Sequence, residues 1–114
     1  MLCARAGLAM LLSGLFIGQG AAFAASAENG KRLFMKVGCW QCHGTVGQGG
    51  AAGPKIAPDP LPYETLTAFL RTTNRAMPPY RETVLSNSDL ADIYAYLQSI
   101  PKPPESDSLP LLKP

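Results

Sequence analysis

The chain of 114 residues has few of the side chains from which catalytic and metal sites are usually built. It contains a single histidine, His43, and three cysteines, of which Cys3 lies close to the N-terminus. Structural zinc sites usually take four Cys or His ligands, arranged in two separated pairs. No second pair accompanies Cys39, Cys42 and His43. The sequence therefore gives little support to a zinc site and leaves one short cluster, "GCWQCHG" at residues 38–44, to be explained.

The chain also lacks a large excess of charge of either sign. Ten Lys and Arg residues stand against eight Asp and Glu residues, a formal net charge of +2. Without Arg5, nine basic residues remain against eight acidic ones, and the net charge is +1. Because nucleic-acid-binding domains usually show a clear basic excess, we expect no nucleic-acid partner.

A long hydrophobic run is absent as well. The N-terminal segment carries one charge, Arg5, and is apolar from about residue 6 to 17, which is shorter than the roughly 20 residues of a membrane span. Small residues follow, and the cleavage rule is met after Ala24 and after Ala27. We expect residues 1–27 to be a secretory signal peptide cleaved near one of these alanines, and the protein to be periplasmic. An uncleaved membrane anchor is the alternative.

The remaining sequence has no internal repeat and no alternation that predicts a strand. The helical period is seen in three stretches, at residues 27–37, 63–73 and 87–99. Ser26 is a candidate N-cap of the first helix, and Ser86 with Asp89 resembles a capping box at the start of the last. We therefore predict an all-α fold of three main helices joined by long loops.

The composition of the segments between and after these helices defines the domain. The loops are rich in Gly, Ala and Pro, and the last segment, "PKPPESDSLPLLKP", is rich in proline. We predict one domain at residues 28–101, followed by a disordered or extended tail at 102–114. A domain of this size buries only a small core, which a large apolar cofactor would enlarge.

The C-x-x-C-H motif is the attachment signature of c-type haem. With two residues between the cysteines, one helical turn presents both sulfurs to the porphyrin edge and directs His43 at the iron. Two alternatives fit less well: a thiol redox pair is expected near a βαβ pattern, which the chain lacks, and a disulfide here would join no separate elements. We therefore predict one covalent haem c, with its iron, attached at Cys39 and Cys42.

The second axial ligand of that iron cannot be a histidine of this chain, because His43 is the only one. Methionine is the usual partner of histidine in c-type haems and raises their reduction potential. Met35 is tethered close to the motif, whereas Met77 lies 34 residues after His43 in "RAMPPY". The two prolines after Met77 stiffen that loop. We predict that His43 and Met77 are the axial ligands.

These segments, in this order, resemble a small bacterial class I cytochrome c over residues 27–100. The segments that carry the resemblance are "GKRLFMKVGCWQCHG", "AGPKIAP", "AMPPY" and "DLADIYAYLQSI". The resemblance implies the cytochrome c fold, wrapped around the haem, with the first and last helices crossing at Gly30 and Phe34 packed near Tyr96 and Leu97. It also implies that the carbonyl of Pro54 accepts a hydrogen bond from the outer nitrogen of His43.

The chain departs from the family pattern in several places. The interval between the axial residues is short, and Thr73-Asn74 stands where relatives have a glycine before the methionine. We expect Asn74 to adopt the left-handed conformation there. Trp40, between the cysteines, is interpreted as packing on the haem or its loop; an aromatic contact for a partner is the alternative. Four further residues are candidates for contacts with the haem propionates, with a plain surface role as the alternative: Tyr63, Arg71, Arg75 and Tyr80.

Together these features predict a periplasmic one-electron carrier rather than an enzyme, because both axial positions of the iron are filled. We expect redox proteins as partners, such as a dehydrogenase or a terminal oxidase or reductase, and no small-molecule substrate. The first alternative is a cytochrome c subunit of a larger periplasmic or membrane-bound dehydrogenase or oxidase complex. The second is an enzyme or gas sensor with an open haem face, which requires that Met77 does not bind the iron.

Overall fold

The structure, a computed structural model, describes residues 24–112. Most of the predicted signal peptide lies outside these residues. The described chain forms four α-helices and two single-turn 3-10 helices: α1 (Ala27–Lys36), α2 (Trp40–His43), α3 (Tyr63–Thr72), α4 (Asn87–Ser99), η1 (Ser106–Ser108) and η2 (Pro110–Leu112). No strand is formed between residues 24 and 112. The all-α prediction is therefore confirmed, and the three predicted helices end within one residue of their predicted bounds.

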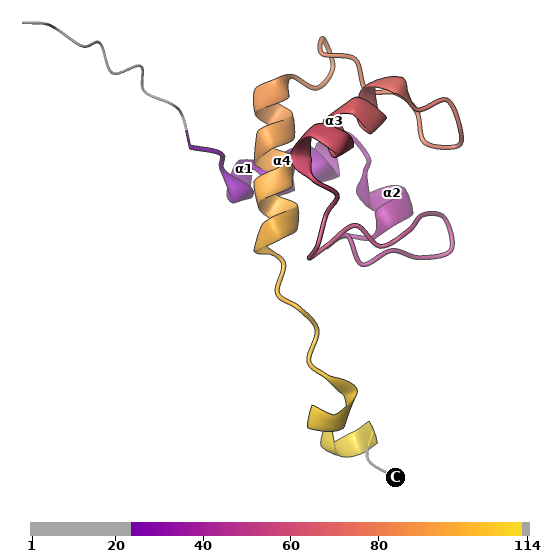
Figure 1. Cartoon of the computed structure of the whole chain (residues 1–114), viewed down its shortest axis with the longest axis vertical. Coiled ribbons are helices and arrows are strands. Elements are labelled where there is room, and N and C mark those ends of the chain that lie inside the picture. Colours follow the sequence, from indigo (N-terminus) through magenta and orange to yellow (C-terminus); the bar gives the residue numbers. More distant parts are fainter. Residues whose placement is uncertain (1–23, 113–114) are drawn as a thin grey trace, which may run out of the picture.

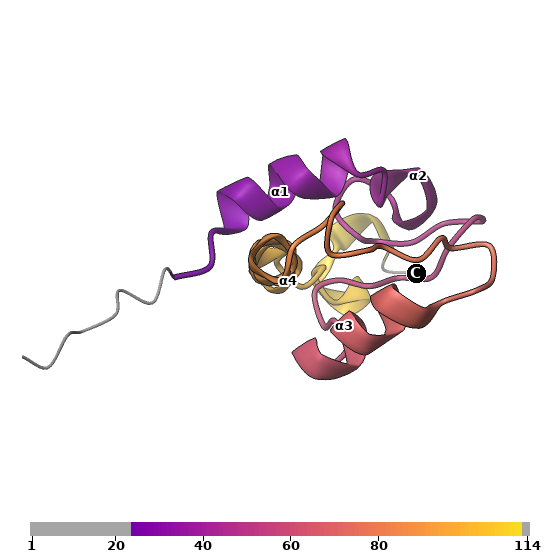
Figure 2. The same ribbon diagram turned by 90° about the horizontal axis from the view of Figure 1, so that it is seen from above.

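Helices α1 and α4 form the most extensive contact between two elements. Figure 2, seen along α4, shows α1 on one side of it and α3 on another, with the loops between them. At the crossing, a Cβ on Gly30 would overlap the backbone carbonyl of Asp92. The rings of Phe34 and Tyr96 pack edge to face, with their centroids 5.6 Å apart. The crossing implied by the family resemblance is therefore present.

The ends of these two helices are fixed by side-chain caps. The hydroxyl of Ser26 accepts a hydrogen bond from the backbone N–H of Asn29 at 3.2 Å. At α4, Ser86 and Asp89 form the predicted capping box, each side chain accepting from the other residue's backbone N–H. Capping satisfies N–H groups that have no partner inside the helix, so both starts are well defined.

The core lies between α4 and the segments that surround it. Its most deeply buried side chains are Phe34, Leu85, Leu90 and Leu97. Leu85 belongs to the loop before α4, and its buried side chain anchors this loop to the core. The small core agrees with the size of the domain.

The expectation for Asn74 is wrong. Within residues 24–112, positive φ angles occur only at glycines, namely Gly38, Gly44, Gly47 and Gly49. Helix α3 ends at Thr72, and the φ of −57° and ψ of 141° of the next residue, Thr73, turn the chain directly into extended backbone. Because the chain leaves the helix without a left-handed cap, neither glycine nor asparagine is needed at this point.

After α4 the chain continues away from the helices, as Figure 1 shows. The tail, predicted to be disordered or extended, contains the two 3-10 helices within its described part. One ion pair joins it to the rest, Lys102 Nζ to Asp59 Oδ1 at 3.6 Å. Among the described residues, no helix is long and apolar enough to cross a membrane.

Candidate functional site

The C-x-x-C-H motif occupies a single helical turn directly after α1. Gly38, at a φ of 86°, redirects the chain between the two helices. Cys39 is the N-cap residue of α2 and His43 is its last residue. The backbone N–H of His43 donates to the carbonyl of Cys39 at 3.1 Å, which closes the turn. Cys39 and Cys42 are both free thiols, the first half-buried and the second exposed.

His43 is buried, with 8 % of its surface exposed. Its Nδ1 lies 2.8 Å from the carbonyl oxygen of Pro54. A carbonyl only accepts hydrogen bonds, so Nδ1 carries a proton, and in the neutral imidazole Nε2 is then the nitrogen with the free lone pair. The family resemblance implied this contact, which fixes the ring orientation and makes the free nitrogen more basic.

The loop that supplies this carbonyl is held by backbone hydrogen bonds. The N–H of Gly49 donates to the carbonyl of His43 at 2.8 Å, and the N–H of Ile56 donates to the carbonyl of Gly47 at 2.8 Å. These bonds fasten residues 47–56 to the end of α2. Pro54 is therefore placed by a folded loop and not by its own bond to the imidazole alone.

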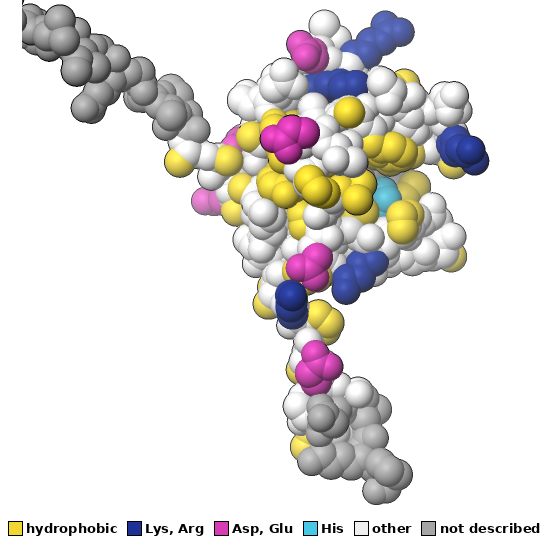
Figure 3. Space-filling model, in the orientation of Figure 1, with side chains coloured by type: hydrophobic (Ala, Val, Ile, Leu, Met, Phe, Trp, Pro, Cys, Tyr) yellow, Lys and Arg dark blue, Asp and Glu magenta, His cyan; other side chains and the backbone are white. Residues whose placement is uncertain are grey.

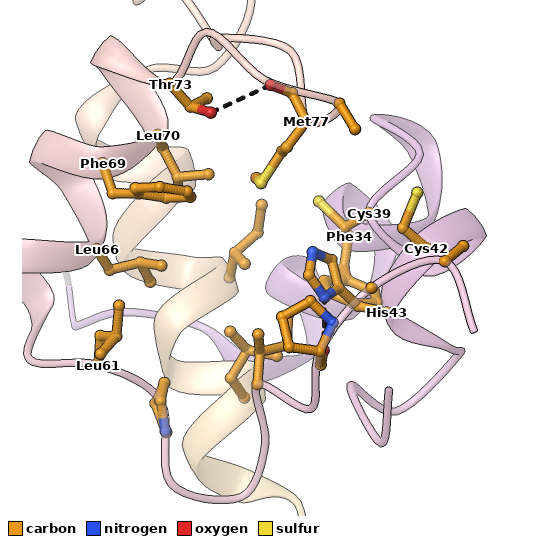
Figure 4. A pocket seen from close by; sticks show the side chains of 18 of the residues that line it. Phe34, Cys39, Cys42, His43, Leu61, Leu66, Phe69, Leu70, Thr73 and Met77 are labelled. Atoms are coloured by element: carbon orange, nitrogen blue, oxygen red, sulfur yellow. Dashed lines mark hydrogen bonds between the residues drawn. The ribbon is translucent and has the colours of Figure 1, made fainter. Parts of the chain in front are cut away.

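A cavity of about 380 Å³ lies beside the motif. Figure 4 shows its walls, to which α3 contributes Leu66, Phe69 and Leu70 and the preceding loop contributes Leu61. In the space-filling view of Figure 3, hydrophobic side chains surround the place where the single histidine is visible. An apolar cavity of this size is in the range of small-molecule and cofactor sites.

Met77 faces the same cavity from the loop between α3 and α4. Its side chain is half-buried, and Figure 4 shows the sulfur directed into the space that His43 and Cys39 border. The hydroxyl of Thr73 donates a hydrogen bond to the carbonyl of Met77 at 3.2 Å. Met35 is 37 % exposed and lines neither cavity next to the motif. The structure thus brings Met77, and not Met35, to the predicted site.

A second cavity of about 390 Å³ also borders the motif. It shares Cys39, Cys42, His43 and Met77 with the first cavity, and it is also lined by Tyr80. The two thiols, the imidazole and the thioether therefore surround one connected region. Its lining, with the apolar wall of the first cavity and two thiols beside the imidazole, fits an apolar group attached through sulfur.

The electrostatics of Cys39 agree with such a group. Burial raises the pKa of its thiol to about 11, because the thiolate would lose its hydration. The sulfur is therefore placed where its neutral form is favoured. A thioether is likewise neutral, so covalent attachment leaves no charge to be buried at this position.

Among the residues considered for propionate contacts, three are already bound to protein groups. Arg71 donates to the carbonyls of Tyr80 and Leu85, Tyr63 donates to the carbonyl of Asn87, and Tyr80 donates to the carbonyl of Val37. Arg75 lines the first cavity and is exposed. These internal bonds cannot be predicted from the sequence, because backbone acceptors outside the hydrogen-bonding pattern of a helix follow no periodic pattern.

Trp40 is 40 % exposed and lines neither cavity. Packing on the haem or its loop, with an aromatic contact for a partner as the alternative, therefore stays a prediction for this residue. Among the residues that the structure describes, no three or more His, Cys, Asp and Glu side chains lie close enough together to hold a metal ion by themselves.

Comparison with known proteins gives one match. A protein-family model described as "Cytochrome C oxidase, cbb3-type, subunit III" matches residues 25–97. No curated protein and no solved structure matches the chain significantly. The matched residues include α1, α2, α3, all but the last two residues of α4, and the whole of the site described above.

Proposed function

Because the chain belongs to the cytochrome c family matched over residues 25–97, we propose that it is a periplasmic one-electron carrier with one haem c, ligated by His43 and Met77. Proteins of this family bind covalent haem c with its iron and act in haem-based electron transfer. When bound, the haem iron supplies a centre that takes up and releases one electron.

The observation that carries the proposal is the arrangement of the two candidate ligands. The bond from His43 Nδ1 to the carbonyl of Pro54 leaves Nε2 available, and the sulfur of Met77 enters the same cavity from another segment. Cys39 and Cys42 lie at one edge of that region and supply the attachment sulfurs. The apolar wall from α3 excludes water, which favours electron transfer over binding of a further ligand.

The periplasmic location is supported by the signal-type N-terminal sequence, with its apolar run and cleavage motifs. The small net charge of the chain supports weak electrostatic steering toward redox partners. A dehydrogenase or a terminal oxidase or reductase has the chemistry to exchange single electrons with such a carrier.

A second candidate function is that of a cytochrome c subunit in a larger dehydrogenase or oxidase complex. The description of the matching family, which names an oxidase subunit, favours it. Size-exclusion chromatography of a native extract distinguishes the two functions. A carrier elutes as a small species, whereas a subunit elutes with a much larger complex.

The ligand assignment is tested by the absorption spectrum of the purified oxidised protein. We expect a far-red Met-to-iron charge-transfer band, which Met77→Ala abolishes and the control Met35→Ala leaves in place. The two variants remove the same side chain, but only Met77 lines the cavity. A wild-type protein with a high-spin spectrum and no such band would contradict the proposal and favour the enzyme or gas sensor.

A further inference from the structure

Arg71 is a cation of α3 that is bound to neutral groups and not to a carboxylate. Its Nη1 donates to the carbonyl oxygens of Tyr80 at 2.7 Å and Leu85 at 2.8 Å, and its Nη2 donates to Asn87 Oδ1 at 2.8 Å. Its Nε is buried without a hydrogen-bond partner. Among residues 24–112, the one ion pair present is between Lys102 and Asp59.

Two of the three acceptors of Arg71, the carbonyls of Tyr80 and Leu85, belong to the segment that carries Met77, and the third, Asn87, is the first residue of α4. Between the end of α3 and the start of α4, residues 73–86 contain no helix or strand. Ordering such a long loop costs conformational entropy at each residue, so its position depends on its few attachments. Arg71 makes two of these attachments, at Tyr80 in the middle of the loop and at Leu85 near its end, and its third bond holds Asn87, the residue of α4 that follows the loop.

The other attachments of the loop lie close to Met77. Thr73 Oγ1 holds the carbonyl of Met77, and the N–H of Tyr80 donates to the carbonyl of Leu70 at 2.8 Å. The hydroxyl of Tyr80 donates to the carbonyl of Val37, just before the C-x-x-C-H motif, at 3.0 Å. Tyr80 therefore joins α3, the Met77 loop and the end of α1, and Arg71 holds the carbonyl of this same residue.

We propose that Arg71 is a positioning residue that fixes the loop so that the sulfur of Met77 stays directed into the haem cavity. This inference rests on the proposed function, in which Met77 is an axial ligand. The guanidinium is suited to the role because its donors are fixed in a planar fork and always carry a positive charge. Hydrogen bonds from a charged donor are about twice as strong as neutral ones.

The experiment measures how fast imidazole replaces Met77 in the oxidised holoprotein, followed by loss of the Met-to-iron band. We expect Arg71→Gln to bind imidazole about tenfold faster or more, because charge-assisted bonds that hold the loop closed are lost. Arg71→Lys keeps the charge but cannot reproduce the fork, so it is expected to show most of the same increase.

The matched control for charge is Arg81→Gln. Arg81 lies in the same loop and is exposed, and its side chain makes no hydrogen bond to any residue from 24 to 112. Its substitution removes the same charge, and we expect the imidazole binding rate to stay within about twofold of wild type. Asn87→Ala, which removes one exposed acceptor of Arg71, provides a milder variant and is expected to give a several-fold increase.

A control for general loss of stability is Leu90→Val, a core change in a residue that lines neither cavity. It is expected to lower the unfolding temperature without accelerating imidazole binding. An Arg71→Lys variant that behaves like wild type, or a Leu90→Val variant as fast as Arg71→Gln at equal stability, would overturn the positioning role. A wild-type protein without the Met-to-iron band would overturn the proposed function and this inference together.

Discussion

At the scale of single residues, Gly30 shows how strongly the fold can depend on the absence of a side chain. Alanine normally stabilises a helix relative to glycine by about 1 kcal/mol. At Gly30 the added methyl group would meet the backbone carbonyl of Asp92 in α4, which cannot move aside as a flexible side chain would. The steric cost therefore exceeds the gain in helix propensity.

We accordingly predict that Gly30→Ala destabilises the holoprotein by about 2 kcal/mol or more, since overpacking of this kind typically costs 1–3 kcal/mol. Thermal unfolding of the purified protein measures the effect. The control is Gly50→Ala, because nothing lies within 4 Å of a Cβ at that position. Equal unfolding temperatures of the two variants would show that α1 and α4 do not cross as closely as described.

The residues of the site differ in how well the sequence predicted them. His43 and Cys42 belong to a contiguous motif whose spacing follows directly from haem attachment. Met77 is predicted as the second iron ligand because the chain has few methionines and no second histidine. The structure places all three around one region. The sequence marks Arg71 only as a candidate propionate contact or a surface residue, because two of its acceptors lie 9 and 14 residues away in an irregular loop. Such contacts depend on the tertiary path of the chain, which no local pattern records.

At the scale of helices, the hydrophobic period was sufficient to predict α3, and the period together with side-chain caps predicted α1 and α4. The caps mattered most, since Ser26 and Ser86 mark the starts of α1 and α4 in the sequence and in the structure. The end of α3 was less predictable. The expectation of a left-handed Asn74 assumed a glycine-like cap at the end of this helix. The backbone is instead extended at Thr73, whose side chain donates a hydrogen bond to the carbonyl of Met77.

The start of α1 also bears on signal-peptide processing. The backbone N–H of Ser26 donates to Asp92 Oδ1 at 2.6 Å, and the amide of Asn29 donates to Asp92 Oδ2 at 2.6 Å. The Asn29 amide, followed by the Ser26 N–H, lowers the pKa of Asp92 because both stabilise the carboxylate. Ser26 therefore serves both as the cap of α1 and as a link to α4.

This geometry predicts cleavage after Ala24, so that the mature chain begins at Ala25. Cleavage after Ala27 would remove Ser26 and its bonds, and loss of such an N-cap typically costs about 1 kcal/mol. The intact mass of the exported holoprotein, with sequencing of its N-terminal peptide, tests the prediction. A chain that begins with Glu28 would contradict it, and an unprocessed chain would contradict the signal-peptide interpretation itself.

At the scale of the whole molecule, the chain divides into a domain that holds the site and a tail that contributes little to it. The site is built from segments that are distant in sequence, since α2, the Pro54 loop, α3 and the Met77 loop all border it. The tail after Pro101 lines neither cavity. Its 3-10 helices contact each other, and neither makes an extensive contact with an α-helix.

We predict that deletion of residues 102–114 leaves the unfolding temperature and the Met-to-iron band of the isolated protein unchanged. The one ion pair that is lost joins side chains that are 76 % and 73 % exposed, and such pairs contribute at most about 1 kcal/mol. Lys102→Ala removes this pair alone and serves as the control for its share. A large fall in unfolding temperature in the truncated protein, but not in Lys102→Ala, would show that the tail packs on the domain.

If the protein is a subunit of a larger complex, the same deletion tests whether the tail, with Leu111 97 % exposed, is used for docking. In that case the truncated protein elutes as a small species from a native extract, whereas the full chain elutes with the complex.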